Sequence, residues 1–144
     1  MFSKYDVYTT VQSMYCYPDT DVLINKLNIH DKAELKQAEE EFTAVKQMAL
    51  LQEPIKGRFT KTHLFRIHRF LFEDVYPFAG HIRKEQISKG DTMFYPPDLI
   101  DRELERVFQN IHSKKLLAEQ DKEKQIQNLS QTMAELNIIH PFRE

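Results

Sequence analysis

The chain of 144 residues lacks several features that mark specialised classes of protein. It has no tryptophan and a single cysteine, Cys16, which excludes an intrachain disulfide and fits a reducing compartment. No apolar run approaches the roughly 20 residues of a membrane-spanning helix. We expect no signal peptide, because neither a basic flank nor an apolar stretch follows Met1. Lys and Arg number 20 against 22 Asp and Glu, so the charge balance gives no general attraction to nucleic acid. We therefore expect one globular domain that binds neither membrane nor nucleic acid.

Glycine is scarce as well, with three in the chain, and apolar residues recur at helical spacing over long stretches. These two features predict a mainly α-helical domain. Asp31 and Glu34 form a candidate capping box for a first helix, which Pro54 and Gly57 should end. One face of this helix is apolar and comprises Leu35, Ala38, Phe42, Val45 and Ala49.

Three more helices and one non-helical segment are expected after Gly57. Thr60 is the predicted N-cap of the second helix, which Pro77 and Gly80 close. Residues 81–97 have sparse apolar residues and the turn signal Lys89-Gly90-Asp91, which indicates a short hairpin or extended flap. The third helix starts near Asp98 and the fourth delivers His140 to its C-terminal end. The apolar residues of these helices are Leu64, Ile67 and Leu71, then Leu104, Val107, Phe108 and Ile111, then Ile126, Leu129, Met133, Leu136 and Ile139.

Four sequence segments, taken in order, resemble those of the Fic family. They are Asp21–Asn28, Phe72–Gly80, the flap residues Ile82-Arg83 with Ile87–Gly90, and Glu135–Glu144, which ends in His-Pro-Phe-Arg-Glu. The resemblance implies the all-α Fic fold, mainly helical with a β-hairpin flap. In that family the last motif continues with Gly-Asn-Gly-Arg. We therefore expect residues 1–144 to form a single Fic domain that is cut within its active-site loop.

The resemblance implies a protein AMP-transferase, which moves AMP from ATP to a Tyr, Thr or Ser hydroxyl of a target protein. His140 would be the base, because an imidazole is largely neutral near physiological pH. Glu144 would help to hold Mg²⁺ on the phosphates, as a hard oxygen ligand. The flap would border the nucleotide and the target through Ile87, Ser88, Lys89 and Gly90, with Lys89 placed to meet a phosphate.

The family's Gly-Asn-Gly-Arg would cradle phosphate oxygens at a helix N-terminus, so residues 1–144 alone are expected to be inactive. Two other functions stay open. One is a Doc-type phosphotransferase, which inverts the nucleotide, and the other is a degenerate Fic module that acts only by protein contacts. Taken alone, His140 also fits a helix C-terminal histidine, and Lys89-Gly90-Asp91 fits a plain turn.

Regulation and location are expected from the same resemblance. Many Fic enzymes are silenced by a helix with Ser/Thr-x-x-x-Glu, and no Ser or Thr in this chain has Glu four residues later. Inhibition of such a toxin would then come from a C-terminal extension or a separate antitoxin chain. A cytoplasmic location is expected, with a bacterial effector delivered to another cell as the alternative. His63 and His68 are five residues apart on a helix and do not share a face, so they make a poor metal pair and are expected at the core edge or the surface.

Overall fold

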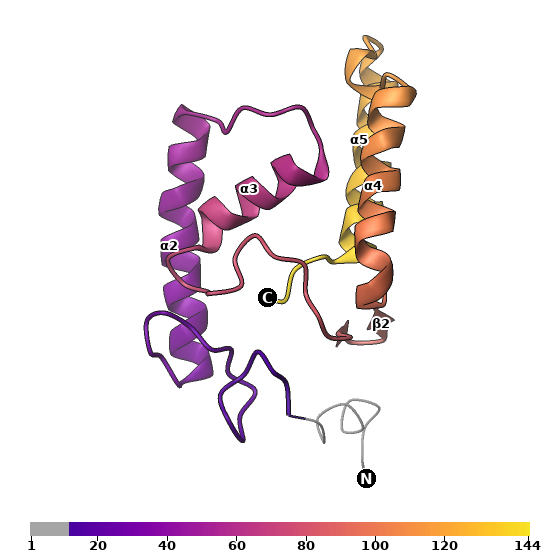
Figure 1. Ribbon diagram of the computed structural model, residues 1–144. Coiled ribbons are helices and arrows are strands. Elements are labelled where there is room, and N and C mark those ends of the chain that lie inside the picture. Colours follow the sequence, from indigo (N-terminus) through magenta and orange to yellow (C-terminus); the bar gives the residue numbers. More distant parts are fainter. Residues whose placement is uncertain (1–11) are drawn as a thin grey trace.

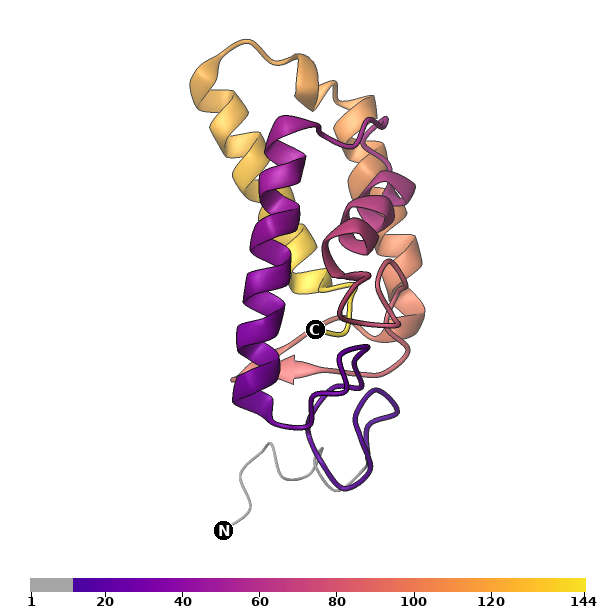
Figure 2. The ribbon, with the colours of Figure 1, turned by 90° about the vertical axis from the view of Figure 1, so that its left-hand side faces the viewer.

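The computed structural model describes residues 12–144 and is mainly helical with one small antiparallel sheet, as predicted. The elements are α2 (Lys32–Gln52), α3 (Lys61–Phe72), β1 (Ser88–Lys89), β2 (Thr92–Met93), α4 (Pro97–Ser113), the 3₁₀ helix η1 (Leu116–Ala118) and α5 (Lys122–Ile139). Helix α2 stands on one side of the molecule and the α4–α5 pair on the other, with α3 between them (Figure 1). Both views place the hairpin and the C-terminal residues toward the same end of the helices (Figure 2).

The helix starts follow from the capping residues that the sequence contains. The Asp31 carboxylate accepts a hydrogen bond from the Glu34 backbone N–H at 2.9 Å, which is half of the predicted capping box. The Thr60 hydroxyl accepts from the His63 N–H at 3.3 Å at the start of α3. A further cap, Asp121, accepts from the Lys124 N–H and opens α5.

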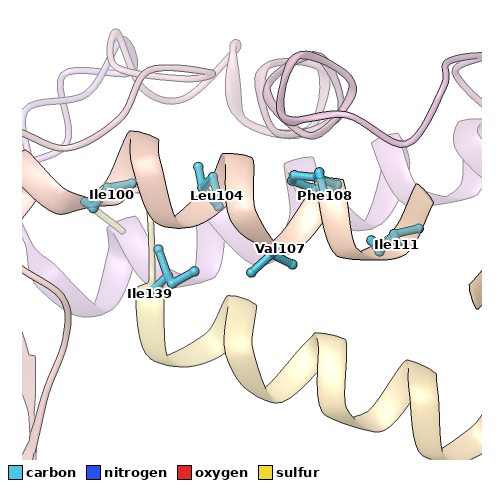
Figure 3. Packing of buried hydrophobic residues seen from close by; sticks show 6 residues of the cluster. All are labelled: Ile100, Leu104, Val107, Phe108, Ile111 and Ile139. Atoms are coloured by element: carbon cyan, nitrogen blue, oxygen red, sulfur yellow. The ribbon is translucent and has the colours of Figure 1, made fainter. Parts of the chain in front are cut away.

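The main hydrophobic core lies along α4. Its buried residues are Ile100, Leu104, Val107, Phe108 and Ile111 of α4 and Ile139 of α5. Val107 points toward α5 and Ile139 toward α4, while Leu104 and Phe108 point to the opposite side of α4 (Figure 3). Leu64 and Phe65 of α3 pack against this cluster. Helix α4 is therefore held between α3 and α5, which fixes the C-terminal end of α5 against the rest of the domain.

Two predicted apolar faces are not core faces among the described residues. On α2 only Leu35 is buried, and Val45 remains 70% exposed, because the helix packs mainly on α3. On α5 the buried residue is Ile139, and the three apolar residues of the earlier turns are exposed: Ile126, Leu129 and Met133. Helix α5 is thus most deeply buried in its last turn, directly before His140.

A second cluster packs the segment after α3 against the start of α2. Val75, Tyr76 and Phe78 are buried there together with Val22 and Leu35. Within residues 12–144, no helix is both long enough and apolar enough to cross a membrane.

Candidate active site

His140 stands where α5 ends, in an unusual backbone conformation. Its φ and ψ are 46° and 71°, in the left-handed region that most side chains disfavour, and its N–H donates to Leu136 O at 3.0 Å. The preceding residue, Ile139, is fully buried and the following one is Pro141, so the helix stops at one defined position. The chain then turns toward α3, which carries residues 140–144 into the middle of the molecule (Figure 1).

The His140 imidazole is held by two contacts. Its ring stacks on Phe94, with centroids 4.4 Å apart and planes at 22°. Its Nε2 lies 3.0 Å from the backbone oxygen of Glu144. Because that oxygen only accepts hydrogen bonds, Nε2 carries the proton in this contact and the lone pair lies on Nδ1. The ring therefore has a basic nitrogen that this contact does not use.

Arg83 joins the flap to the end of α5 from a buried position, with 1% of the residue exposed. Its guanidinium donates to four carbonyl oxygens, at 2.5–3.1 Å: those of Glu85, Tyr95, Ile139 and His140. Its backbone N–H donates to Pro141 O at 2.9 Å. Burial, and then the nearby Arg143, lower the pKa of Arg83 from its usual value. One side chain thus holds the flap on both sides of the hairpin, at Glu85 and Tyr95, together with the backbone of His140.

Glu144 lies in a largely enclosed position, with 16% of its side chain exposed. Its Oε1 is 2.6 Å from His68 Nε2. Its Oε2 is buried, and none of residues 12–144 offers it a hydrogen bond. An unpartnered buried carboxylate oxygen is costly unless a donor or a cation meets it.

Magnesium fits this donor set as an ion shared with phosphates. A lone hard carboxylate oxygen suits Mg²⁺, which proteins commonly hold through one or two carboxylates together with substrate phosphates. Among residues 12–144, no group of three or more His, Cys, Asp or Glu side chains is arranged to hold a metal by itself. Glu144 would therefore supply one ligand, and the phosphates would supply others.

Two residues that sequence reasoning missed lie close to Glu144. Glu39 of α2 accepts a hydrogen bond from the Tyr76 hydroxyl. Burial raises the pKa of Glu39, and the negative charge of Glu144 adds to the rise. Burial and the Glu39 carboxylate raise the pKa of Tyr76, so its hydroxyl stays a donor. Their sequence positions gave no signal, because 37 residues separate the two partners.

The flap forms the predicted hairpin. Ser88 pairs with Met93 and Lys89 with Thr92, with Gly90 in the turn at φ 61°. Ser88, Lys89 and Gly90 are exposed and Ile87 is half-buried. No atom of the described residues would lie within 4 Å of a Cβ at Gly90, so the positive φ, and not a close neighbour, explains the glycine.

The base of the flap reaches the histidine through Phe94. The Phe94 N–H donates to Ile87 O at 3.3 Å, and the aromatic ring of the same residue stacks on His140. The structure therefore brings the predicted residues His140, Glu144 and Ile87 into one region. Lys89 lies exposed on β1, outside this contact, and its predicted role at a phosphate stays a prediction.

Comparisons of this chain with family models, curated proteins and solved structures agree on one family. The Fic/DOC family matches residues 58–144. The chain is 36% identical over 138 residues to the "Probable protein adenylyltransferase y4lH" of Sinorhizobium fredii. The matched residues make up 95% of this chain and 70% of that protein.

Two solved structures extend the likeness to the fold. The N-terminal Fic domain of a Bartonella effector protein from Bartonella sp. AR 15-3 has a TM-score of 0.82 and 27% identity, over 90% of this chain and 64% of that one. The N-terminal Fic domain of a putative cell filamentation protein from Bartonella quintana, with bound ADP, has a TM-score of 0.80 and 25% identity, over 90% and 68%. The chain thus spans about two thirds of the length of these proteins. It belongs to the Fic/DOC family.

Proposed function

We propose that this protein transfers AMP from ATP to a Tyr, Thr or Ser hydroxyl of a target protein. The observation that supports it best is His140, a histidine held at the left-handed end of α5 with its Nδ1 lone pair unused by the Glu144 contact. The relative from Sinorhizobium fredii is named a probable adenylyltransferase, and the similar Bartonella quintana domain holds ADP. Both fit a nucleotide substrate for this chain.

The reaction needs a proton acceptor beside the attacking oxygen. His140 Nδ1 would take the proton of the target hydroxyl as that oxygen bonds to the α-phosphorus of ATP. The bond from the α-phosphorus to the bridging oxygen breaks, and pyrophosphate leaves with the electron pair. Mg²⁺, when bound, would neutralise charge on the phosphates. Glu144 would hold that ion through Oε2, and Arg83 and Phe94 would keep the imidazole in place.

The flap would position the target hydroxyl. Its strands are short and exposed, and a strand edge offers backbone N–H and C=O groups to an extended peptide whatever the peptide's sequence. The backbone of Ile87–Gly90 would face the target, and the Lys89 side chain would meet a phosphate. Phe94 would link this docking surface to the base, because its N–H donates to Ile87 O and its ring stacks on His140.

The cellular setting is part of the proposal. The reaction would take place in the cytoplasm, of the producing cell or of a cell that receives the protein as a toxin, because ATP and target proteins are present there. The similar Bartonella sp. AR 15-3 protein is described as a VirB-translocated effector. Because the chain lacks a Ser/Thr-x-x-x-Glu sequence, an inhibitory glutamate would come from an antitoxin chain or from residues outside this chain.

The test uses the full-length protein with a lysate as the source of targets. ATP labelled at the α-phosphate should label protein, and ATP labelled at the γ-phosphate should not. The reverse pattern would replace AMP transfer by the Doc-type phosphotransferase. If neither label is transferred at any target concentration, an interaction module replaces both enzymes.

A further inference from the structure

His68 is a buried residue of α3 and not the edge or surface residue expected from sequence, since only 5% of it is exposed. Its ring lies between two aromatic rings. Phe142 is stacked at a centroid distance of 3.6 Å and 11°, and Phe72 at 4.7 Å and 29°. A buried polar ring at this place has to be explained by its two nitrogens, because a phenyl ring would pack equally well.

Both nitrogens of His68 are engaged, and one of the contacts fixes the position of the proton. The Gly80 N–H donates to Nδ1 at 2.9 Å, so Nδ1 has the lone pair. Nε2 therefore carries a proton, and it donates to Glu144 Oε1 at 2.6 Å. The contact is a hydrogen bond from a neutral ring to a carboxylate and not an ion pair.

Gly80 is needed for this arrangement. Its φ is 80°, and a Cβ at this position would lie 2.8 Å from Arg69 Cβ and 3.1 Å from Phe65 O. A side chain would push the turn away from α3 and withdraw the N–H that His68 accepts. The turn after α3 thus sets the His68 tautomer, and that tautomer sets the donor that faces Glu144.

The consequence for Glu144 is an oriented carboxylate. One oxygen is held by His68, so the group cannot rotate freely. The other, Oε2, is enclosed and has no partner in the part of the chain that the structure describes. Metal-binding carboxylates are commonly held in this way by a hydrogen bond to their second oxygen. The Phe142 stack fixes the same loop two residues earlier.

We infer that His68 is a positioning residue, which donates to Glu144 Oε1 so that Oε2 is presented to Mg²⁺ on the nucleotide. This inference rests on the proposed function for its chemistry. It adds a residue on α3 to a site otherwise built from the flap and the end of α5. His68 acts through Glu144 and touches no substrate.

A matched pair of variants separates donation from packing. His68→Phe keeps an aromatic ring between Phe72 and Phe142 and removes the donor, whereas His68→Gln keeps an N–H donor and loses the stack. In the full-length protein, His68→Phe should raise the Mg²⁺ concentration for half-maximal AMP transfer about 10- to 100-fold. His68→Gln should keep a half-maximal Mg²⁺ concentration close to that of the wild type. In a Glu144→Gln background, His68→Phe should have little further effect. Wild-type Mg²⁺ dependence in His68→Phe would overturn the inference.

Two measurements do not need activity. Long-range ¹H–¹⁵N spectra of the wild-type histidine rings should show His68 protonated at Nε2 alone, with a signal that moves in Glu144→Gln. An Nδ1-protonated ring would overturn the inference even if His68→Phe fails to fold. Paramagnetic Mn²⁺ with ATP should bind about tenfold more weakly to folded His68→Phe than to the wild type. A wild-type protein that transfers no AMP would refute the proposed function, while the spectra and the Mn²⁺ titration would still decide the role of His68.

Discussion

The backbone of His140 matters as much as its ring. A left-handed residue ends α5, turns the chain toward α3 and places the imidazole against Phe94. Among residues other than glycine, asparagine tolerates this conformation well. The two properties of His140, its backbone conformation and its basic nitrogen, can therefore be separated by one substitution.

We predict that His140→Asn lowers AMP transfer by at least about 100-fold, the usual contribution of a general base, because the amide cannot accept the target proton. Thermal unfolding should change little, since Asn keeps the helix end and the buried Ile139 before it. Initial rates with α-labelled ATP and circular dichroism on the same samples check both parts. Transfer at the wild-type rate would remove His140 from the mechanism.

Glu39 gives a pH-dependent prediction. Its pKa is raised in the folded protein, mainly by burial, so its ionised form destabilises the fold at neutral pH. Glu39→Gln keeps an oxygen for the Tyr76 hydroxyl and removes the charge. The variant should therefore unfold at a higher temperature than the wild type at pH 7. The difference should shrink as the pH falls through the raised pKa, and vanish below the ordinary value of 4.5.

Melting curves from pH 3 to pH 8 measure this effect. Glu40→Gln is the matched control, because Glu40 is the next residue of α2 and is exposed. Its melting temperature should differ less from that of the wild type. If the melting temperature of Glu39→Gln, relative to that of the wild type, instead rises as the pH falls, folding lowers the pKa of Glu39 and does not raise it.

At the scale of elements, local signals were sufficient where the cause is local. Asp31 and Thr60 cap the helices that they were predicted to cap, and the turn at Gly90 lies where the glycine signal placed it. The apolar faces of α2 and α5 were misleading, because spacing reports that a face is apolar and not what packs on it. Val45 is exposed although its spacing is that of a core residue.

The hairpin supplies a prediction about docking. Gly90→Pro would force φ to about −65° where the turn has +61° and would remove a backbone N–H, so the strands should lose their register. Gly90→Asn is the control, because Asn accepts a left-handed φ. Transfer to a protein target should fall much further in Gly90→Pro than ATP affinity, which titration calorimetry measures. Equal losses, or none, would mean that the flap does not dock the target.

At the scale of the whole molecule, the site depends on contacts between distant segments that a single sequence does not reveal. His68 and Glu144 are 76 residues apart, and Arg83 binds carbonyl groups, which every residue has. A family resemblance identified the ends of this network, His140 and the flap. The connections between them follow only from tertiary packing, in which Phe142 contacts Phe65 and His68 of α3.

Arg83 tests whether the flap and the end of α5 behave as one unit. Arg83→Met fills similar space but leaves four carbonyl groups without their donor, at a cost of about 1–3 kcal/mol for each group that stays buried. Arg83→Lys keeps the charge, but all three of its N–H donors are on one nitrogen. That nitrogen cannot reach all the carbonyl groups that the planar guanidinium spans. We expect both variants to be destabilised, Arg83→Met more than Arg83→Lys.

The location of the damage is the sharper prediction. Hydrogen exchange should speed up in residues 84–95 and in the last turn of α5 together, because Arg83 is bonded to both. Exchange in α2 should change less, since it packs on α3 and on the cluster around Val75 and Tyr76. A matched exposed control, Arg102→Met, should change neither region. Uniform acceleration throughout the domain would mean that Arg83 stabilises the fold as a whole, and unchanged exchange near His140 would mean that the flap and the histidine are held independently.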